Sequence, residues 1–146
     1  MIAPSLLSAD FAHLSQEMEW FNRSKADWLH LDIMDGVFVP NISFGFPVLK
    51  YVAELCTKPL DVHLMIVQPE KFVREVAALG AHVMSVHYET CPHLHRVLGQ
   101  IRDAGMKAGV VLNPATAQHN SCSDQELPLG CRLQLCHQQE QGIVNA

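Results

Sequence analysis

Two residues that could bind a metal ion stand at alternating positions of one short apolar segment. Residues 30–36 read HLDIMDG. Because successive side chains of a β-strand point to opposite faces, His30, Asp32 and Met34 would share one face of this strand. Two aliphatic side chains would cover the other face. The segment therefore combines an imidazole, a carboxylate and a thioether on a single surface.

A second segment repeats this pattern. Residues 61–66 read DVHLMI, so His63 and Met65 would share a face of their strand. Two strands with polar ligands on one face and hydrophobic residues on the other predict a metal-centred reaction site on the inner side of a barrel.

The three ligands His30, Asp32 and His63 make a mixed nitrogen and oxygen set. Such a set suits Zn, Fe(II), Mn or Co, and spacing alone does not choose among them. Three protein ligands leave positions open for substrate oxygens. A divalent metal ion there would stabilise negative charge on a carbonyl that becomes an enediolate. A carboxylate beside that oxygen can remove the neighbouring proton.

Each of these residues also has a structural interpretation. A lone inward histidine is more often a hydrogen-bonded core residue than a ligand. A buried carboxylate is harder to explain without a partner, and this favours the metal site for the three residues together. Met34 and Met65 alone would be core residues, and Ser8 alone a turn residue. His87 could line the same cavity, but core packing explains it at least equally well.

Composition describes a globular protein and limits its partners. The 146 residues are 49% hydrophobic and 17% charged, and the formal net charge is -5. An acidic chain without a basic run is a poor fit to nucleic acid. No apolar run approaches the roughly 20 residues of a membrane span, and the first residues lack a secretory signal pattern. We expect a cytoplasmic protein with a small-molecule substrate and no nucleic-acid or membrane partner.

Short apolar segments alternate with amphipathic ones from residue 2 to about residue 113. This alternation is typical of a parallel sheet whose strands are joined by helices. We expect strands over residues 2–7, 28–34, 60–66, 82–88 and 108–112, with helices between them.

Two parallel folds fit this order, an open doubly wound sheet and a closed barrel. Polar residues that face inward on two neighbouring strands favour the barrel, because an open sheet is covered by apolar packing on both faces. The first strand is also not followed by G-x-G-x-x-G, which argues against a dinucleotide-binding fold.

The pattern ends near residue 116. Residues 117–146 are rich in Gln, Ser, Cys and His and show neither a convincing strand nor sustained helical periodicity. We therefore expect the N-terminal part of a barrel over residues 1–116 and a divergent, poorly ordered tail over residues 117–146. The expected fold is α/β, of the parallel (β/α)8 TIM-barrel type, truncated to about five βα units with an unpatterned C-terminal tail.

The first 116 residues resemble the ribulose-phosphate 3-epimerase family. The motifs are long and follow one another in order along the chain. They are IAPSLLSADF over residues 2–11, HLDIMDG over 30–36, FVPN with FG over 38–45, and DVHLM over 61–65.

The resemblance implies a barrel enzyme of the pentose phosphate pathway that interconverts D-ribulose 5-phosphate and D-xylulose 5-phosphate. It implies one divalent metal ion held by His30, Asp32 and His63, together with a second Asp from the later half. The carboxylate of Asp32 would act as acid and base on one face of the substrate, and the second Asp on the other face. The result would be inversion through an enediolate.

The resemblance also implies that Ser8 and His63 contact the substrate and that Met34 and Met65 line its pocket. Two family features are missing. No two glycines are adjacent, so the glycine-rich phosphate loops are not found. The second catalytic acid is not found either, since Asp124 stands in no matching context.

Three functions stay open at this point. The chain could belong to the epimerase family and be inactive in its truncated form. A related barrel could act on another ketose phosphate, such as a hexulose 6-phosphate. A non-catalytic fragment could bind a metal or form a homo-oligomer in which two copies cover each other's open edges.

Overall fold

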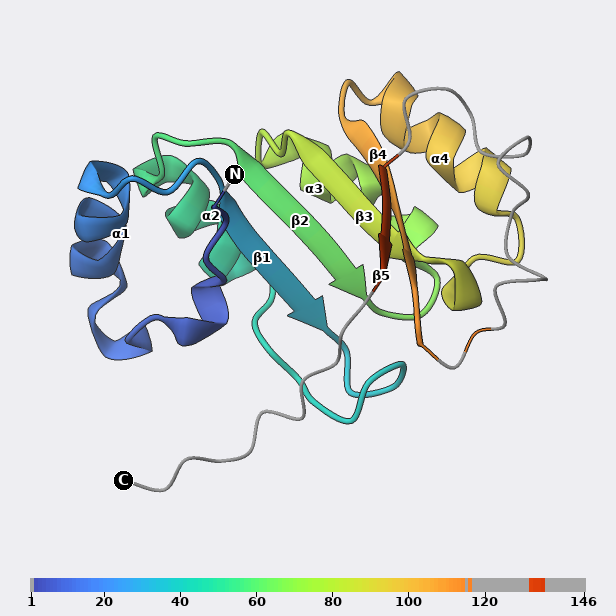
Figure 1. Ribbon diagram of the computed structural model, residues 1–146, viewed down its shortest axis with the longest axis horizontal. Helices are drawn as coiled ribbons and strands as arrows, with labels where there is room; N and C mark the ends of the chain where they lie inside the picture. Colours follow the sequence, from blue (N-terminus) through green and yellow to red (C-terminus); the bar gives the residue numbers. More distant parts are fainter. Residues whose placement is uncertain (1, 115, 117–131, 136–146) are drawn as a thin grey trace.

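A single parallel sheet organises the chain (Figure 1). The computed structural model describes residues 2–114, 116 and 132–135. The sheet has the order β1-β2-β3-β4-β5, and every neighbouring pair is parallel. The strands are β1 Leu29–Met34, β2 Leu60–Met65, β3 Val83–His87, β4 Lys107–Leu112 and β5 Arg132–Leu135.

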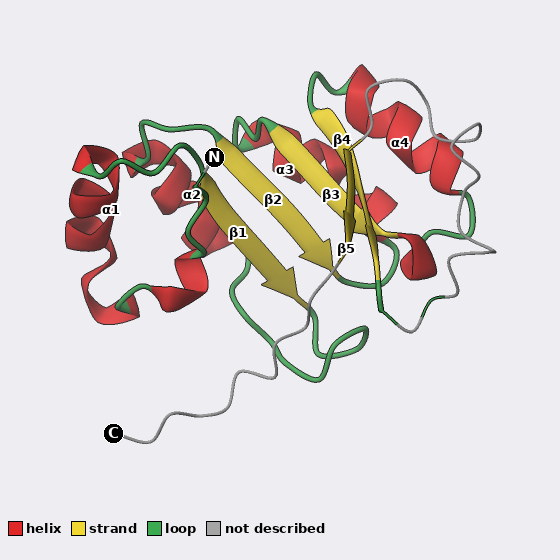
Figure 2. Ribbon diagram, in the orientation of Figure 1, coloured by secondary structure: helices red, strands yellow, loops and turns green. Residues whose placement is uncertain are grey.

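Helices connect the first four strands and lie on one face of the sheet (Figure 2). In a doubly wound sheet helices cover both faces, whereas in a barrel they form only the outer layer. The described residues therefore confirm the parallel-barrel type of α/β fold. No described helix is long and apolar enough to cross a membrane. The helices are α1 Leu14–Arg23, α2 Phe46–Leu55, α3 Val73–Ala78 and α4 Leu94–Asp103, with the 3-10 turns η1 Leu6–Ser8, η2 Phe11–His13, η3 Pro69–Phe72 and η4 Tyr88–Thr90.

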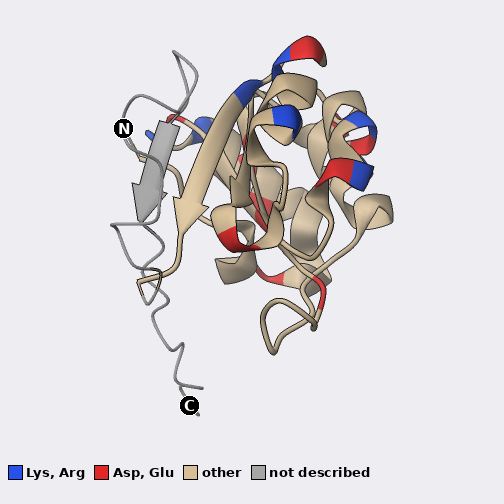
Figure 3. Cartoon of the chain, turned by 90° about the vertical axis from the view of Figure 1, so that its right-hand side faces the viewer, with Lys and Arg blue, Asp and Glu red and all other residues tan. Residues whose placement is uncertain are grey.

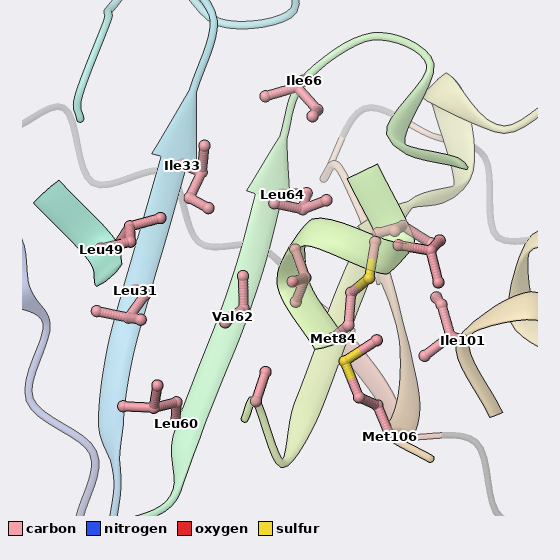
Figure 4. Close-up of a cluster of buried hydrophobic side chains, with 14 of the residues drawn as sticks. Leu31, Ile33, Leu49, Leu60, Val62, Leu64, Ile66, Met84, Ile101 and Met106 are labelled. Atoms are coloured by element: carbon pink, nitrogen blue, oxygen red, sulfur yellow. The ribbon is translucent and has the colours of Figure 1, made fainter. Parts of the chain in front are cut away.

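The hydrophobic core fills the space between the sheet and these helices (Figure 4). Alternate residues of β1 to β4 point into it, as the period of two requires. Leu31, Val62 and Leu49 of α2 are fully buried members of this cluster. Burying a side chain of this size stabilises the fold by roughly 1.5–3 kcal/mol. This packing fixes which strand residues remain for the opposite face.

The prediction of a strand over residues 2–7 is wrong in extent. This segment runs beside β1, where the carbonyls of Ile2 and Pro4 accept hydrogen bonds from Trp28 and His30. Only one isolated parallel bridge forms, between Ser5 and His30. Pro4 has no N–H to donate, and the chain turns into η1 directly after Ser5, so pairing does not continue.

β3 and β4 approach closely on the face that points away from the helices. Gly109 of β4 pairs with Ser85 of β3. A Cβ added at Gly109 would collide with the Ser85 hydroxyl, and the Ser85 Cα would lie only 3.3 Å away. Glycine is required here because a side chain would push the two strands apart.

The structure differs from the sequence prediction at the tail. We expected no strand after residue 116, but Arg132–Leu135 form β5, which pairs with the last four residues of β4. The segment combines Leu133 and Leu135 with polar residues over only four positions, too short for periodicity to identify a strand. The rest of the tail lies outside the described residues, so its expected disorder stays a prediction.

Candidate metal centre

β1 presents two of the predicted ligands on the face that points away from the helices. Leu31 and Ile33 pack into the core, whereas His30, Asp32 and Met34 alternate with them and are partly exposed. The alternation expected from the sequence is confirmed here.

The register of the sheet places the third predicted ligand beside the second. Asp32 of β1 pairs with His63 of β2, and His30 pairs with Asp61. Paired residues on neighbouring parallel strands point to the same face, so all of these side chains meet. The polar surface follows from one register, and a shift by one residue would turn His63 into the core.

The predicted ligands form one compact cluster. His30 Nε2 and His63 Nδ1 each lie 3.0 Å from the same oxygen, Asp32 Oδ1. The ligand atoms of all three residues lie within 4.8 Å of one another. Two imidazoles and one carboxylate at this spacing fit a divalent metal ion such as Zn, Fe(II), Mn or Co.

Asp32 is held ionised. Burial alone would raise its pKa, but hydrogen bonds from His30, His63 and Ser5 outweigh burial and hold the pKa of this carboxyl well below its usual range. Ser5 donates from Oγ to the second oxygen, Oδ2, over 2.6 Å. Both carboxylate oxygens are thus engaged, and the group is an anion at neutral pH. The sequence did not identify Ser5 as a site residue.

A second carboxylate, that of Asp61, orients His30 through the ring nitrogen that does not contact Asp32. His30 Nδ1 lies 2.9 Å from Asp61 Oδ2, and Asp61 is 5% exposed. Burial disfavours the charged imidazole, but Asp32 and Asp61 more than compensate and raise the pKa of His30 to about 9. Because Asp61 binds Nδ1, the other nitrogen, Nε2, is directed at the cluster. Asp61 was missed, although it lies two positions before His63 on the same face of β2.

His63 contacts a further imidazole, that of His87. Its Nε2 lies 2.9 Å from His87 Nε2, and His87 Nδ1 lies 3.3 Å from Glu89 Oε2. His87 is completely buried. Burial lowers the pKa of His87 to about 4, aided by His63 and opposed by Glu89. His87 is therefore a neutral, buried residue of this network, and a position lining a cavity stays a prediction.

The remaining predicted site residues lie around the cluster. Met34 pairs with Met65 at the carboxyl ends of β1 and β2, and Met65 is 5% exposed. Ser8 ends η1, where its amide donates to the Ser5 carbonyl over 3.1 Å, and its residue is exposed. Within the described residues the Ser8 side chain makes no hydrogen bond to the cluster. Contact of Ser8, His63, Met34 and Met65 with substrate stays a prediction.

The loop after β1 is held in place by Asp35. Its carboxylate accepts hydrogen bonds from the amides of Val37 and Phe38 in the same loop and of Val67 after β2, over 2.8–2.9 Å. This holds the Phe38 ring 4.7 Å from the ring of His87. The loop thus packs its Phe38 ring against His87.

Charge is distributed unevenly along the strand direction. In the view of Figure 3, the visible Lys and Arg residues lie toward the end opposite to the carboxyl ends of the strands, whereas Asp and Glu residues lie near both ends. An acidic edge raises the local concentration of cations. The distribution agrees with a cation site at this end of the sheet.

A profile of the ribulose-phosphate 3 epimerase family matches residues 1–123. The chain belongs to this family. All three clustered residues lie in the matched range, and the resemblance inferred from the motifs is confirmed.

Curated relatives agree with this assignment. The chain is 53% identical over 118 residues to the ribulose-phosphate 3-epimerase of Synechocystis, covering 80% of this chain and 51% of the relative. It is 50% identical over 115 residues to the protein of that name from Bacillus subtilis, covering 79% and 53%. To the chloroplastic ribulose-5-phosphate-3-epimerase of Arabidopsis thaliana it is 48% identical over 118 residues, covering 80% and 42%. The chain spans about half the length of the curated relatives it matches.

Proposed function

We propose that this chain carries the metal site and one of the two proton-transfer groups of a ribulose-phosphate 3-epimerase. The reaction would interconvert D-ribulose 5-phosphate and D-xylulose 5-phosphate. The observation that carries the proposal is the His30–Asp32–His63 cluster, in which both imidazoles converge on one carboxylate oxygen. Family membership supplies the reaction class.

His30, Asp32 and His63 would hold one divalent ion, Zn, Fe(II), Mn or Co. When bound, the ion would stabilise the negative charge that develops on the substrate oxygens next to the reacting carbon. Three protein ligands leave coordination positions for these oxygens.

Asp32 would transfer the proton on one face of the substrate. The low pKa of this carboxyl keeps it in the form that accepts a proton. Its two oxygens are fixed by Ser5 and the two imidazoles, which limits the motion of the base before transfer. The substrate carbon C3 carries a hydroxyl and is bonded to the carbonyl carbon C2. It would lose its proton to Asp32, and the C–H electron pair would form the double bond of an enediolate.

Inversion needs a second acid that returns the proton to the other face. We propose that this group and the phosphate-binding loops belong to the half of the relatives that the chain does not span. Asp124 lies outside the described residues. The roles of Ser8 as a substrate contact and of Met34 and Met65 as apolar walls beside the enediolate follow from the same family pattern.

A deuterium exchange experiment tests the role of Asp32. The chain would be incubated with D-ribulose 5-phosphate and Zn²⁺ or Co²⁺ in D2O, and the C3 hydrogen followed by NMR. Removal and return of the proton on one face exchanges this hydrogen without forming D-xylulose 5-phosphate. We expect exchange in the wild type, its loss in Asp32→Asn, and no change in Asp103→Asn, which alters an exposed carboxylate of α4.

Metal content would be measured on each sample, because Asp32 is both a ligand and the proposed base. Exchange that persists in Asp32→Asn would refute the role of Asp32. So would a metal-loaded wild type that exchanges neither D-ribulose 5-phosphate nor D-xylulose 5-phosphate, because only one of the two epimers presents its C3 hydrogen to the face on which Asp32 lies. A hexulose 6-phosphate run in parallel distinguishes the substrates, since faster exchange there would favour the alternative epimerase. The cytoplasmic location and the homo-oligomer stay predictions.

A further inference from the structure

A series of hydrogen-bonded side chains, buried at His63 and His87, leads away from the metal centre toward the end of β4. It runs from His63 to His87 to Glu89. The other oxygen of Glu89, Oε1, accepts hydrogen bonds from the Asn113 amide over 2.8 Å and from the Thr116 hydroxyl. Neither metal binding nor proton transfer uses His87 or Glu89 directly.

Simple core packing does not account for His87. The residue is completely buried, and both of its ring nitrogens have polar partners. A contact between two imidazole nitrogens can hold only one proton, so one ring must donate and the other must accept. This requirement leaves two possible arrangements of protons along His63, His87 and Glu89, one for each direction of donation.

The metal-facing nitrogen of His63 decides the direction. Its Nδ1 points at the cluster, and a neutral imidazole that binds metal through Nδ1 carries its proton on Nε2. His63 Nε2–H must then donate to His87 Nε2. The proton of His87 is left on Nδ1, where it donates to Glu89.

We infer that His87 and Glu89 are positioning residues that hold His63 in its metal-binding tautomer and orientation. Glu89 acts through His87 and ties the pair to the loop after β4 by its bonds to Asn113 and Thr116. His63 thus receives through an intermediate imidazole the support that Asp61 gives directly to His30. Outer carboxylates of this kind commonly fix the ring and the basicity of a metal-binding histidine. The inference rests on the proposed metal site.

Zinc affinity of the full chain tests the inference, measured by competition with a chelating dye. Loss of outer partners typically weakens metal binding roughly 10- to 100-fold, so we expect this range for His87→Phe and about tenfold for Glu89→Gln. Phenylalanine keeps the ring volume and removes both hydrogen bonds. Matched controls are His95→Phe on the exposed face of α4 and Glu75→Gln on α3, which should bind zinc as the wild type does.

The double variant separates an indirect role from a general structural one. If Glu89 acts through His87, then Glu89→Gln adds no further loss of affinity in the His87→Phe background. Additive losses of zinc affinity would show that Glu89 does not act through His87. Glu89 is the partly exposed member of the hydrogen-bonded series, so Glu89→Gln keeps the test available if His87→Phe does not fold.

The tautomer of His87 gives a readout that does not depend on affinity. Ring ¹⁵N NMR of the zinc-loaded chain should show a proton on Nδ1 of His87 and none on Nε2. A proton on Nε2, or wild-type zinc affinity in both single variants, would overturn the inference while leaving the metal site intact. Failure of the wild type to bind zinc would overturn the proposed function as well.

Discussion

Asp32 is the point at which the hydrogen bonds of the site converge. His30 and His63 both reach its Oδ1, and Ser5 binds its Oδ2. In the metal-free chain, protons on the imidazoles hold these residues together. The same nitrogens must release their protons to bind a metal ion. Protonation and metal binding are therefore alternative ways to stabilise one cluster.

The metal-free chain should lose stability at alkaline pH. The pKa of His30 is raised from 6.5 to about 9 because Asp32 and Asp61 outweigh burial. The contribution of charged His30 to folding is complete below about pH 6.5 and is lost as the pH rises through about 9. We expect a lower free energy of unfolding near pH 10 than near pH 6, measured by urea denaturation with a chelator present.

Other groups also titrate in this window, so the comparison needs matched variants. His30→Gln should flatten the dependence on pH, whereas His95→Gln on exposed α4 should keep it. An identical slope in His30→Gln and the wild type would show that His30 does not cause it.

At the scale of elements, strand alternation predicts the ligands and register determines their partners. The alternating pattern in β1 and β2 placed His30, Asp32 and His63 on one face, and the structure confirms this. The same rule could have identified Asp61. The contact of His63 with His87 depends on how β2 and β3 pair, which a single sequence does not specify.

Ser5 could not be predicted because it lies where a strand ends and a turn begins. Its backbone forms one bridge with β1, and its hydroxyl both caps η1 and donates to Asp32. A hydrogen bond to an ion contributes roughly 1.5–3 kcal/mol. We expect Ser5→Ala to lower the free energy of unfolding by about this amount, measured by urea denaturation of the metal-free chain.

Ser8 supplies the matched control within the same turn. Its residue is exposed and its amide, not its hydroxyl, bonds to Ser5. Ser8→Ala should leave the free energy of unfolding within about 0.5 kcal/mol of the wild type, as is usual for surface positions. Equal losses in both variants would mean that the bond from Ser5 to Asp32 contributes nothing specific.

At the scale of the whole molecule, the fold separates packing from chemistry. One face of the sheet packs against helices, and the other carries the cluster (Figures 2 and 4). The chain spans about half the length of its curated relatives, yet its three clustered candidate ligands come from only two neighbouring strands. The central claim is that this part of the epimerase fold is sufficient to bind a metal ion.

Titration of the metal-free chain with Co²⁺, followed by visible absorption, tests this claim most directly. We predict uptake of about one ion per chain with the absorption of a site of mixed nitrogen and oxygen ligands. Removing a ligand in His63→Asn should weaken binding by at least about tenfold, whereas His95→Asn should bind as the wild type does. No uptake by the wild type, or the same uptake in His63→Asn, would contradict the account.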